Sequence, residues 1–237
     1  MPIVRKSALP ASIAAPATHD EAPVNQRVYK ALRRAIINCT LAPGTPLSET
    51  DVSTLFDVSR QPVRESFIKL VEAGLVRVLP QRGTYVMKIS VKQVLDARFI
   101  REAIETAVVR QAAQSIGQDD LDILADNLQQ QARACQRDDM AQFLLLDDAF
   151  HAQLAASIDC RSAWASIETL KAHMDRVRYL TLDHISPMHE LLAQHQQLFQ
   201  ALADGDQAGA VAAIQAHLAQ LTETLVKVSE RYPDWFE

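Results

Sequence analysis

Four polar positions in the second half of the chain could together bind a metal ion. Asp147 and His151 are four residues apart in a stretch whose apolar positions recur at helical spacing, so both side chains lie on one face of a helix. His195 and His217 interrupt two later apolar stripes, again at positions that should face the core. One carboxylate and three imidazoles suit a divalent transition metal such as Zn, Ni, Co or Mn, with positions left open for water or an acidic ligand.

A purely structural explanation of these polar positions is also open. An inward-facing histidine can be a core residue whose neighbours satisfy its hydrogen bonds, because every buried polar group needs a partner. Asp148 is an alternative to Asp147, but only Asp147 shares the face of His151 by its spacing. His173 lies beside another apolar stripe, and the spacing leaves its role undecided.

A second set of polar residues, nearer the N-terminus, could contact nucleic acid. Arg60 and Arg64 are four residues apart and therefore share one helix face, with Gln61 between them. Arginine can form two hydrogen bonds with guanine, and glutamine can do the same with adenine. A glycine at a hairpin tip would let the backbone come close to a phosphate. The candidate DNA-contacting residues are Ser59, Arg60, Gln61, Arg64, Arg82 and Gly83.

Three helices and a hairpin are predicted to position this second set. Apolar residues at helical spacing predict a first helix over 24–37, Ser48 caps a second helix of about two turns, and Ser59 caps a third. Two short runs of β-forming residues, 75–79 and 84–88, surround a turn and predict a hairpin. Three helices followed by a hairpin are typical of a winged helix-turn-helix.

The metal-type residues lie in a region with almost no strand signal. Apolar stripes at helical spacing recur there with short breaks, which predicts an antiparallel all-α bundle. The chain as a whole is therefore expected to be mainly α, with a disordered tail over 1–22, a winged helix-turn-helix over 23–89 and a helical domain over 90–231. The predicted helices of the bundle are 92–115, 119–136, 139–157, 160–182, 188–203 and 206–230.

Charge is divided unevenly between the two predicted domains. The whole chain has a formal net charge of -5, yet residues 24–89 contain ten Lys and Arg against five Asp and Glu. Residues 90–237 contain twelve against twenty-two. A basic N-terminal domain suits a phosphate backbone, because neutralising phosphates releases counterions and supplies much of the affinity for DNA.

Other compositional features exclude several classes of protein. No run approaches the roughly 18 consecutive apolar residues of a membrane span, and the first 23 residues lack the apolar core of a secretory signal. We therefore expect a cytoplasmic protein with no membrane partner. Cys39, Cys135 and Cys160 are widely spaced, which argues against both a disulfide framework and a zinc knuckle.

Four segments of the N-terminal region resemble the GntR family of bacterial transcription regulators. The resemblance implies a winged helix-turn-helix that binds double-stranded operator DNA, with Ser59, Arg60, Gln61, Arg64 and Gly83 as the contacting set. Family members commonly have an arginine beside the leucine of the first segment, where this chain has Pro46. The four segments are Pro43–Glu49, Val58–Glu65, Glu72–Val76 and Arg82–Val86.

The helical region resembles the FCD effector domain that follows the DNA-binding domain in FadR-like members of that family. The FCD pattern is Asp-x-x-Phe-His on one helix and a histidine on each of two later helices. Asp147–His151 matches the first part, and His195 and His217 match the second. The resemblance implies that these residues bind metal, and that the domain binds a small carboxylate metabolite whose acid group joins the metal and meets an arginine.

Three arginines are candidates for this contact with the acid. Arg101 comes first because the stretch 101–105 is similar to an Arg-x-x-Leu-Glu segment of the family, and Arg98 lies one turn earlier. Arg178 is the second candidate. For each of them an intrahelical ion pair or a solvated charge is the alternative. The segment 174–180 looks most like regulators of sugar-acid use.

These observations together predict a ligand-responsive transcription regulator and not an enzyme. In this hypothesis the protein is a homodimeric repressor on a palindromic operator, and acid binding at the metal changes the spacing of its two DNA-binding domains. One alternative is a helical metal-dependent hydrolase, since an open metal site could activate water. Another alternative is an architectural DNA-binding protein whose polar core is structural.

Overall fold

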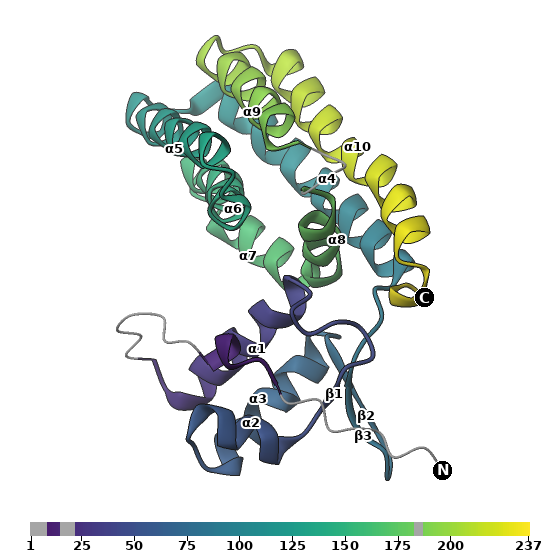
Figure 1. Ribbon diagram of the computed structural model, residues 1–237. Helices are drawn as coiled ribbons and strands as arrows, with labels where there is room; N and C mark the ends of the chain where they lie inside the picture. Colours follow the sequence, from purple (N-terminus) through teal and green to yellow (C-terminus); the bar gives the residue numbers. More distant parts are fainter. Residues whose placement is uncertain (1–8, 15–21, 183–186) are drawn as a thin grey trace. The chain divides into compact units, whose positions relative to one another are not determined.

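The computed structural model describes residues 9–14, 22–182 and 187–237, which form two compact units. The first unit, called the head below, contains the described residues up to Ser90 together with Tyr232–Glu237. The second, called the helical unit, is Val91–Arg231. Figure 1 shows helices in both units and strands only in the head. The fold is mainly α, as the sequence predicts.

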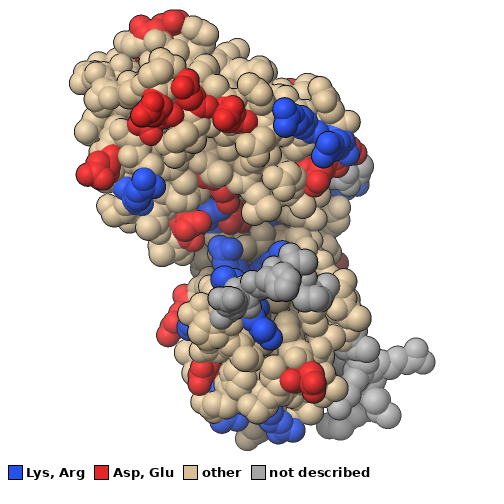
Figure 2. All heavy atoms as spheres, turned by 90° about the vertical axis from the view of Figure 1, so that its left-hand side faces the viewer, with Lys and Arg blue, Asp and Glu red and all other residues tan. Residues whose placement is uncertain are grey.

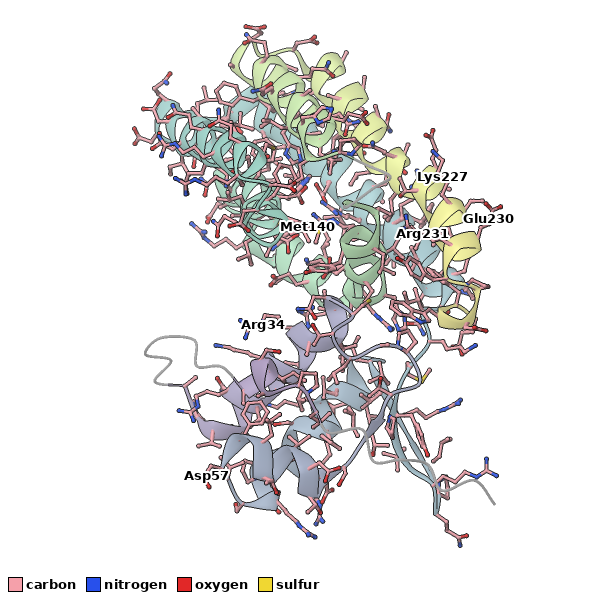
Figure 3. The ribbon with its side chains drawn as sticks, in the orientation of Figure 1. Arg34, Asp57, Met140, Lys227, Glu230 and Arg231 are labelled. Carbon is pink, nitrogen blue, oxygen red and sulfur yellow. The ribbon has the colours of Figure 1, made fainter. Side chains whose placement is uncertain are left out.

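Three helices form the body of the head: α1 (Val24–Ile37), α2 (Glu49–Phe56) and α3 (Arg60–Glu72). The apolar face of α1 is buried and packs against α3. Ser48 caps α2 as expected, because its hydroxyl accepts a hydrogen bond from the Asp51 amide at 3.3 Å. Asp57, whose φ is 51°, ends α2 at the tight connection to α3 (Figure 3).

A small antiparallel sheet follows α3 and forms the wing. Strand β3 (Gly83–Val86) lies between β1 (Pro46–Leu47) and β2 (Val76–Leu79). The predicted hairpin is β2 and β3, whereas β1 was not predicted because two residues are too short for a periodic signal. Gly83 has a φ of 102°, a conformation that favours glycine. The head is therefore a winged helix-turn-helix.

A short ordered segment precedes this domain, where the sequence predicted only a disordered tail. Ala11–Ala14 form one turn of 3-10 helix that packs against α1 and α2, and the side chain of Ile13 is only 3% exposed. The prediction is wrong for this segment because one apolar side chain, isolated in the sequence, finds an apolar surface in the fold. The rest of the predicted tail lies outside the described residues, apart from Ala22 and two residues before Ala11.

The C-terminus also belongs to the head. The last six residues, Tyr232–Glu237, are grouped with it, and Pro233–Trp235 form a 3-10 turn. The amide of Ile89 donates to the Trp235 carbonyl at 2.8 Å, and the amide of Glu237 donates to the Ile89 carbonyl at 3.1 Å. The chain therefore passes between the two units twice, once after Ser90 and once after Arg231.

The helical unit is an all-α bundle in which α4 packs against α10 and α5 packs against α6. Apolar side chains from most of its helices meet in one core, which includes the fully buried Phe150 and Leu124. Lys227 and Glu230 project outward from the last turns of α10 (Figure 3). Within the described residues no helix is long and apolar enough to span a membrane. The helices are α4 (Val91–Ser115), α5 (Gln118–Gln136), α6 (Met140–Ser157), α7 (Arg161–Leu170), α8 (Ala172–Leu182), α9 (Met188–Ala203) and α10 (Gln207–Arg231).

One predicted helix, 160–182, is in fact two helices. The break falls at Lys171, between α7 and α8, with neither a glycine nor a proline to signal it. The Lys171 ammonium group is buried and forms ion pairs with Asp148 and Asp175. These tertiary contacts accompany the break, which is why the periodicity of the sequence did not reveal it.

We predict that Phe236→Ala destabilises the head, because Phe236 is only 9% exposed and its segment pairs with Ile89. The expected loss is about 3 kcal/mol, as for other large-to-small changes of buried aromatic side chains. Hydrogen exchange of the Ile89 amide should accelerate accordingly. Val226→Ala is the control, since Val226 is 56% exposed. Equal protection of Ile89 in both variants would contradict the prediction.

Candidate metal centre and nucleic-acid interface

The four metal-type residues converge in the centre of the helical unit. Asp147 and His151 come from α6, His195 from α9 and His217 from α10. One ligand-type atom from each lies within 4.8 Å of the others, and all four side chains are buried. The ring centroids of His195 and His217 are 4.6 Å apart, and each lies 5.2–5.3 Å from that of His151. The cluster could therefore hold one metal ion.

Each imidazole is held by a hydrogen bond at its outer nitrogen. His195 Nδ1 donates to the Gln131 side-chain carbonyl at 2.8 Å, and His217 Nδ1 donates to that of Gln194 at 2.8 Å. His151 Nδ1 donates to the Glu105 carboxylate. Because Nδ1 carries the hydrogen in each ring, the lone pair is on Nε2, which is the arrangement found in metal-binding histidines.

The inner nitrogens lack partners of their own. Nε2 of His151 and Nε2 of His195 are buried without a hydrogen-bond partner. His195 Nε2 lies 3.6 Å from Asp147, and His151 Nε2 lies 3.9 Å from it, both too long for a hydrogen bond. Buried polar atoms without partners are rare and costly. A cation at the centre of the cluster would satisfy both nitrogens, so the donor set fits a metal.

The carboxylate of Asp147 is held ionised by its surroundings. Burial alone would raise the pKa of Asp147, but the charge of Arg178, which forms an ion pair with it, holds that pKa well below its ordinary range. Asp148, the alternative ligand, points elsewhere and pairs with Lys171 and Arg178. The geometry therefore places Asp147 in the cluster and leaves Asp148 outside it.

Glu105 connects the cluster to the first arginine candidate. Its carboxylate accepts from His151 on one oxygen and pairs with Arg101 on the other. Burial opposes ionisation, yet the charge of Arg101 and the hydrogen bonds from His151 and Arg101 lower the pKa of Glu105 to about 2. The guanidinium of Arg101 keeps one buried nitrogen, Nη2, without a hydrogen-bond partner.

A cavity of about 520 Å³, counted together with its opening to solvent, adjoins the cluster. Asp147 and His217 are among its lining residues. The three arginine candidates line it as well, and they differ in the number of ion pairs and hydrogen bonds that they form within the protein. Arg98 pairs with Glu102 and donates to a backbone carbonyl, and Arg178 pairs with three aspartates. These arginines are Arg98, Arg101 and Arg178.

Sequence reasoning missed the residues that orient the histidines. Gln131 is fully buried on α5 in line with Leu124 and Leu128, so a polar residue in an apolar stripe could have been noticed. Gln194 precedes a histidine and carries no comparable signal. Glu105 was considered only as part of a family segment, because its partner His151 is 46 residues away in sequence.

The candidate DNA-contacting residues lie on the surface of the head. Ser59 is the N-cap residue of α3, although its side chain makes no capping hydrogen bond, and Gln61 donates to Glu65 at 3.1 Å. Arg64 forms two hydrogen bonds with Glu49, at 3.1 and 3.2 Å. This partner was not predicted from the sequence. The six exposed residues are Ser59, Arg60, Gln61, Arg64, Arg82 and Gly83.

Figure 2 shows mostly acidic side chains, with some basic ones, over the presented face of the helical unit, and basic side chains in more than one place on the head, including its lower edge. A winged helix-turn-helix with this charge and a helical domain with a buried ligand-type cluster define a DNA-binding transcription regulator. Residues 24–86 match the gntR family of bacterial regulatory proteins, and residues 96–220 match the FCD domain. The chain belongs to the GntR family of regulators with an FCD domain.

Named relatives agree with this assignment. The HTH-type transcriptional repressor RspR of Escherichia coli K12 is 50% identical over 214 residues, covering 90% of this chain and 94% of RspR. An HTH-type regulator from an unstable DNA locus of Streptomyces ambofaciens is 35% identical over 211 residues, covering 88% of each chain. These names and the family indicate a regulator and not an enzyme, so the hydrolase alternative is not supported.

Solved structures show the same fold. Escherichia coli McbR/YncC superposes with a TM-score of 0.74 at 22% identity and covers 87% of this chain and 98% of its own. A GntR transcriptional regulator from Rhodococcus sp. RHA1 has a TM-score of 0.72 at 26% identity, covering 85% and 97%.

We predict that the metal-free helical unit loses stability on mild acidification. Burial lowers the pKa of His195 to about 3, although Asp147 acts in the opposite direction, and burial also lowers the pKa of His217. In the unfolded chain these histidines have a pKa of about 6.5 and take up protons below that pH, whereas in the native state they stay neutral. The free energy of unfolding therefore decreases as the pH is lowered. For His195 the expected loss between pH 7 and pH 5 is about 2 kcal/mol.

Urea unfolding in chelator, followed by the fluorescence of Trp164 in a Trp235→Phe background, measures this dependence. His195→Asn should show a smaller loss over the same interval, and His189→Asn, at an exposed position, should behave like the parent. The same pH dependence in all three proteins would show that His195 is not the group responsible.

Proposed function

We propose that this protein is a homodimeric repressor that binds a palindromic operator, and that a small carboxylic acid held at a divalent metal in the helical unit controls it. The observation that carries the proposal is the inward Nε2 atoms of His151 and His195, which are buried without partners beside a cavity lined by Arg101, whose Nη2 is also buried without a partner. Unsatisfied imidazole nitrogens and an unsatisfied guanidinium N–H are complementary to a metal ion and a carboxylate.

The metal would be held by Asp147, His151, His195 and His217. An oxygen and three imidazole nitrogens suit Zn, Ni, Co or Mn, and the set leaves coordination positions open. When bound, such an ion supplies positive charge that attracts a carboxylate. Glu105, Gln131 and Gln194 hold the imidazoles in place through Nδ1.

The acid would enter the cavity and meet Arg101. The unpaired Nη2 of Arg101 can donate to a carboxylate, and a charge-assisted hydrogen bond of this kind is stronger than a neutral one. Arg98 lines the same cavity and adds positive charge there. Arg178 is engaged with Asp147, Asp148 and Asp175, so we assign it mainly to holding Asp147 and only secondarily to the acid.

Operator DNA would be bound by the N-terminal part of α3 and by the tip of the wing. Arg60, Gln61 and Arg64 are exposed on α3, with Ser59 at its N-cap, and Arg82 and Gly83 are exposed on the hairpin. Arg64 would exchange its hydrogen bonds with Glu49 for bonds with a base edge or phosphate.

Dimerisation and repression have separate support. Phe99 is 72% exposed on α4 and Leu95 on the same helix is 40% exposed, an apolar surface that a second copy could cover. A dimer would place two α3 helices on the two half-sites of a palindrome. The name repressor belongs to the relative RspR, which is 50% identical to this chain.

We predict that Asp147→Ala and His195→Ala each abolish retention of Zn²⁺ by the purified protein. Emission spectroscopy after dialysis against metal-free buffer measures the bound metal. His189→Ala, an exposed histidine next to Met188, should retain the parental content. Unchanged metal content in both core variants would rule out the proposed centre.

Glu105→Gln should weaken Zn²⁺ binding by about 10- to 100-fold, the usual effect of losing the outer hydrogen-bond partner of a metal-binding histidine. Competition with a fluorescent chelator measures the affinity. Glu102→Gln is the matched control, because Glu102 lies about one turn before Glu105 on α4 and pairs with Arg98 and not with a histidine. An affinity equal to that of the control would show that Glu105 does not orient His151.

Arg64→Ala should weaken operator binding by about 1–3 kcal/mol if Arg64 contacts a base. Titration of labelled operator DNA at moderate salt measures the change. Arg133→Ala, on α5 of the helical unit, provides a control of equal charge loss. If the two variants bind equally well, Arg64 is not part of the interface.

A further inference from the structure

The exposed side of α3 has apolar residues as well as the polar ones proposed to contact operator DNA. Ile68 is 53% exposed and Val71 is 43% exposed. The other large apolar residues of the helix, Val63, Phe67 and Leu70, are buried in the head. Single exposed apolar side chains are common on protein surfaces, so their position relative to the polar residues decides whether they have a role.

Ile68 lies on the same side of α3 as three candidate DNA-contacting residues. Successive residues of an α-helix are turned by about 100°, so Ile68 is turned by about 80° from Arg60, which is eight positions earlier. Arg64 and Gln61 are turned from Arg60 by about 40° and about 100° in the same direction. All four exposed side chains therefore share a sector of about 100°, and the buried residues of α3 lie outside it.

The position of Ile68 along the helix axis also places it close to the polar residues. At a rise of about 1.5 Å per residue, Ile68 is about 6 Å beyond Arg64 and about 12 Å beyond Arg60. The major groove of B-DNA is about 12 Å wide and admits an α-helix. When Arg60 and Arg64 contact base edges in this groove, Ile68 faces the base pairs next to them.

The major groove offers only one kind of apolar group to such a side chain. Its base edges present hydrogen-bond donors and acceptors, together with the C5 methyl group of thymine. An isoleucine that covers a donor or an acceptor removes it from water without replacing its hydrogen bond, which is unfavourable. An isoleucine that covers a methyl group buries apolar surface on both partners, which is favourable. Thymine is therefore the base that Ile68 fits.

The side chain of Ile68 is also restricted before any DNA is bound. A β-branched residue in a helix has one strongly preferred χ1 rotamer, so it loses little conformational entropy when it makes a contact. The polar residues of the same sector are oriented differently, by carboxylates: Glu49 accepts from Arg64, and Glu65 accepts from Gln61. Ile68 thus needs no partner within the head to keep its side chain directed outward.

We propose that Ile68 contacts the C5 methyl group of a thymine in each operator half-site and thereby contributes to sequence selection. This inference rests on the proposed function for the placement of α3 in the major groove. It goes further, because it adds an apolar contact by a residue outside the six DNA-contacting candidates and specifies the base that this residue recognises.

Replacing thymine by deoxyuridine tests the contact, because it removes the methyl group and leaves the hydrogen-bonding edges unchanged. The full-length protein first selects a duplex from a random library, and each thymine is then replaced in turn, together with its symmetry mate. Fluorescence anisotropy should show a position at which binding weakens about fourfold for each methyl group removed, the effect of losing one buried methyl-sized group. In Ile68→Ala the same replacement should change the affinity by less than about twofold, because the two partners are coupled.

A matched control separates this contact from a general effect of removing apolar surface. Val78 on β2 of the wing is 58% exposed, and Val78→Ala should keep the full sensitivity to deoxyuridine. Thymine methyl groups are presented in the major groove and not in the minor groove that a wing enters. Ile68→Ala should also weaken binding of the unmodified duplex without changing its salt dependence, because no phosphate contact is lost. Melting temperatures verify that each variant is folded.

The outcomes separate this inference from the proposed function. If no thymine is sensitive to replacement in the parent, or if the sensitivity persists in Ile68→Ala or disappears in Val78→Ala, the inference is wrong. The proposed interface stands in that case as long as Arg64→Ala weakens binding of the selected duplex. If Ile68 shows no coupling and Arg64→Ala binds as tightly as the parent, the proposed interface fails together with the inference.

Discussion

The helical unit depends on three hydrogen bonds that hold the outer nitrogens of its buried histidines. Glu105, Gln131 and Gln194 accept from Nδ1 of His151, His195 and His217, and Nε2 of His151 and of His195 lie 3.9 and 3.6 Å from Asp147. Metal-free, this arrangement is costly, because Nε2 of His151 and of His195 is buried without a partner. Unsatisfied buried nitrogens reduce the stability of the metal-free core, but they are suited to bind a cation.

Buried charges around the cluster are nearly all paired. Asp147 is paired with Arg178, and Glu105 with Arg101, so neither carboxylate has to be neutralised by a proton on burial. Removing one member of such a pair leaves the other uncompensated, which is why these residues act as a group. Among the described residues that line the cavity, Arg101 is an exception to this pairing, because its buried Nη2 has no hydrogen-bond partner.

Two connections join the head to the helical unit. One follows Ser90, and the other follows Arg231, after which the last six residues pair with Ile89 in the head. Helix α10 leads into this second connection and also includes His217 and Gln220, which line the cavity. The helix that would contact metal and effector is thus continuous in sequence with a segment of the DNA-binding unit, which gives a direct covalent route between the two.

The sequence alone determined the winged helix-turn-helix, the helical bundle and the inward faces of Asp147, His151, His195 and His217, because periodicity and capping are local properties of the chain. It did not reveal the break at Lys171 or the pairing of Ile89 with the C-terminus. It also did not reveal that Asp148 forms an ion pair with Lys171. The partners of the histidines were also decided only by tertiary structure. These features join residues far apart in sequence, and which polar groups remain unsatisfied depends on every neighbour that packing brings within hydrogen-bonding distance.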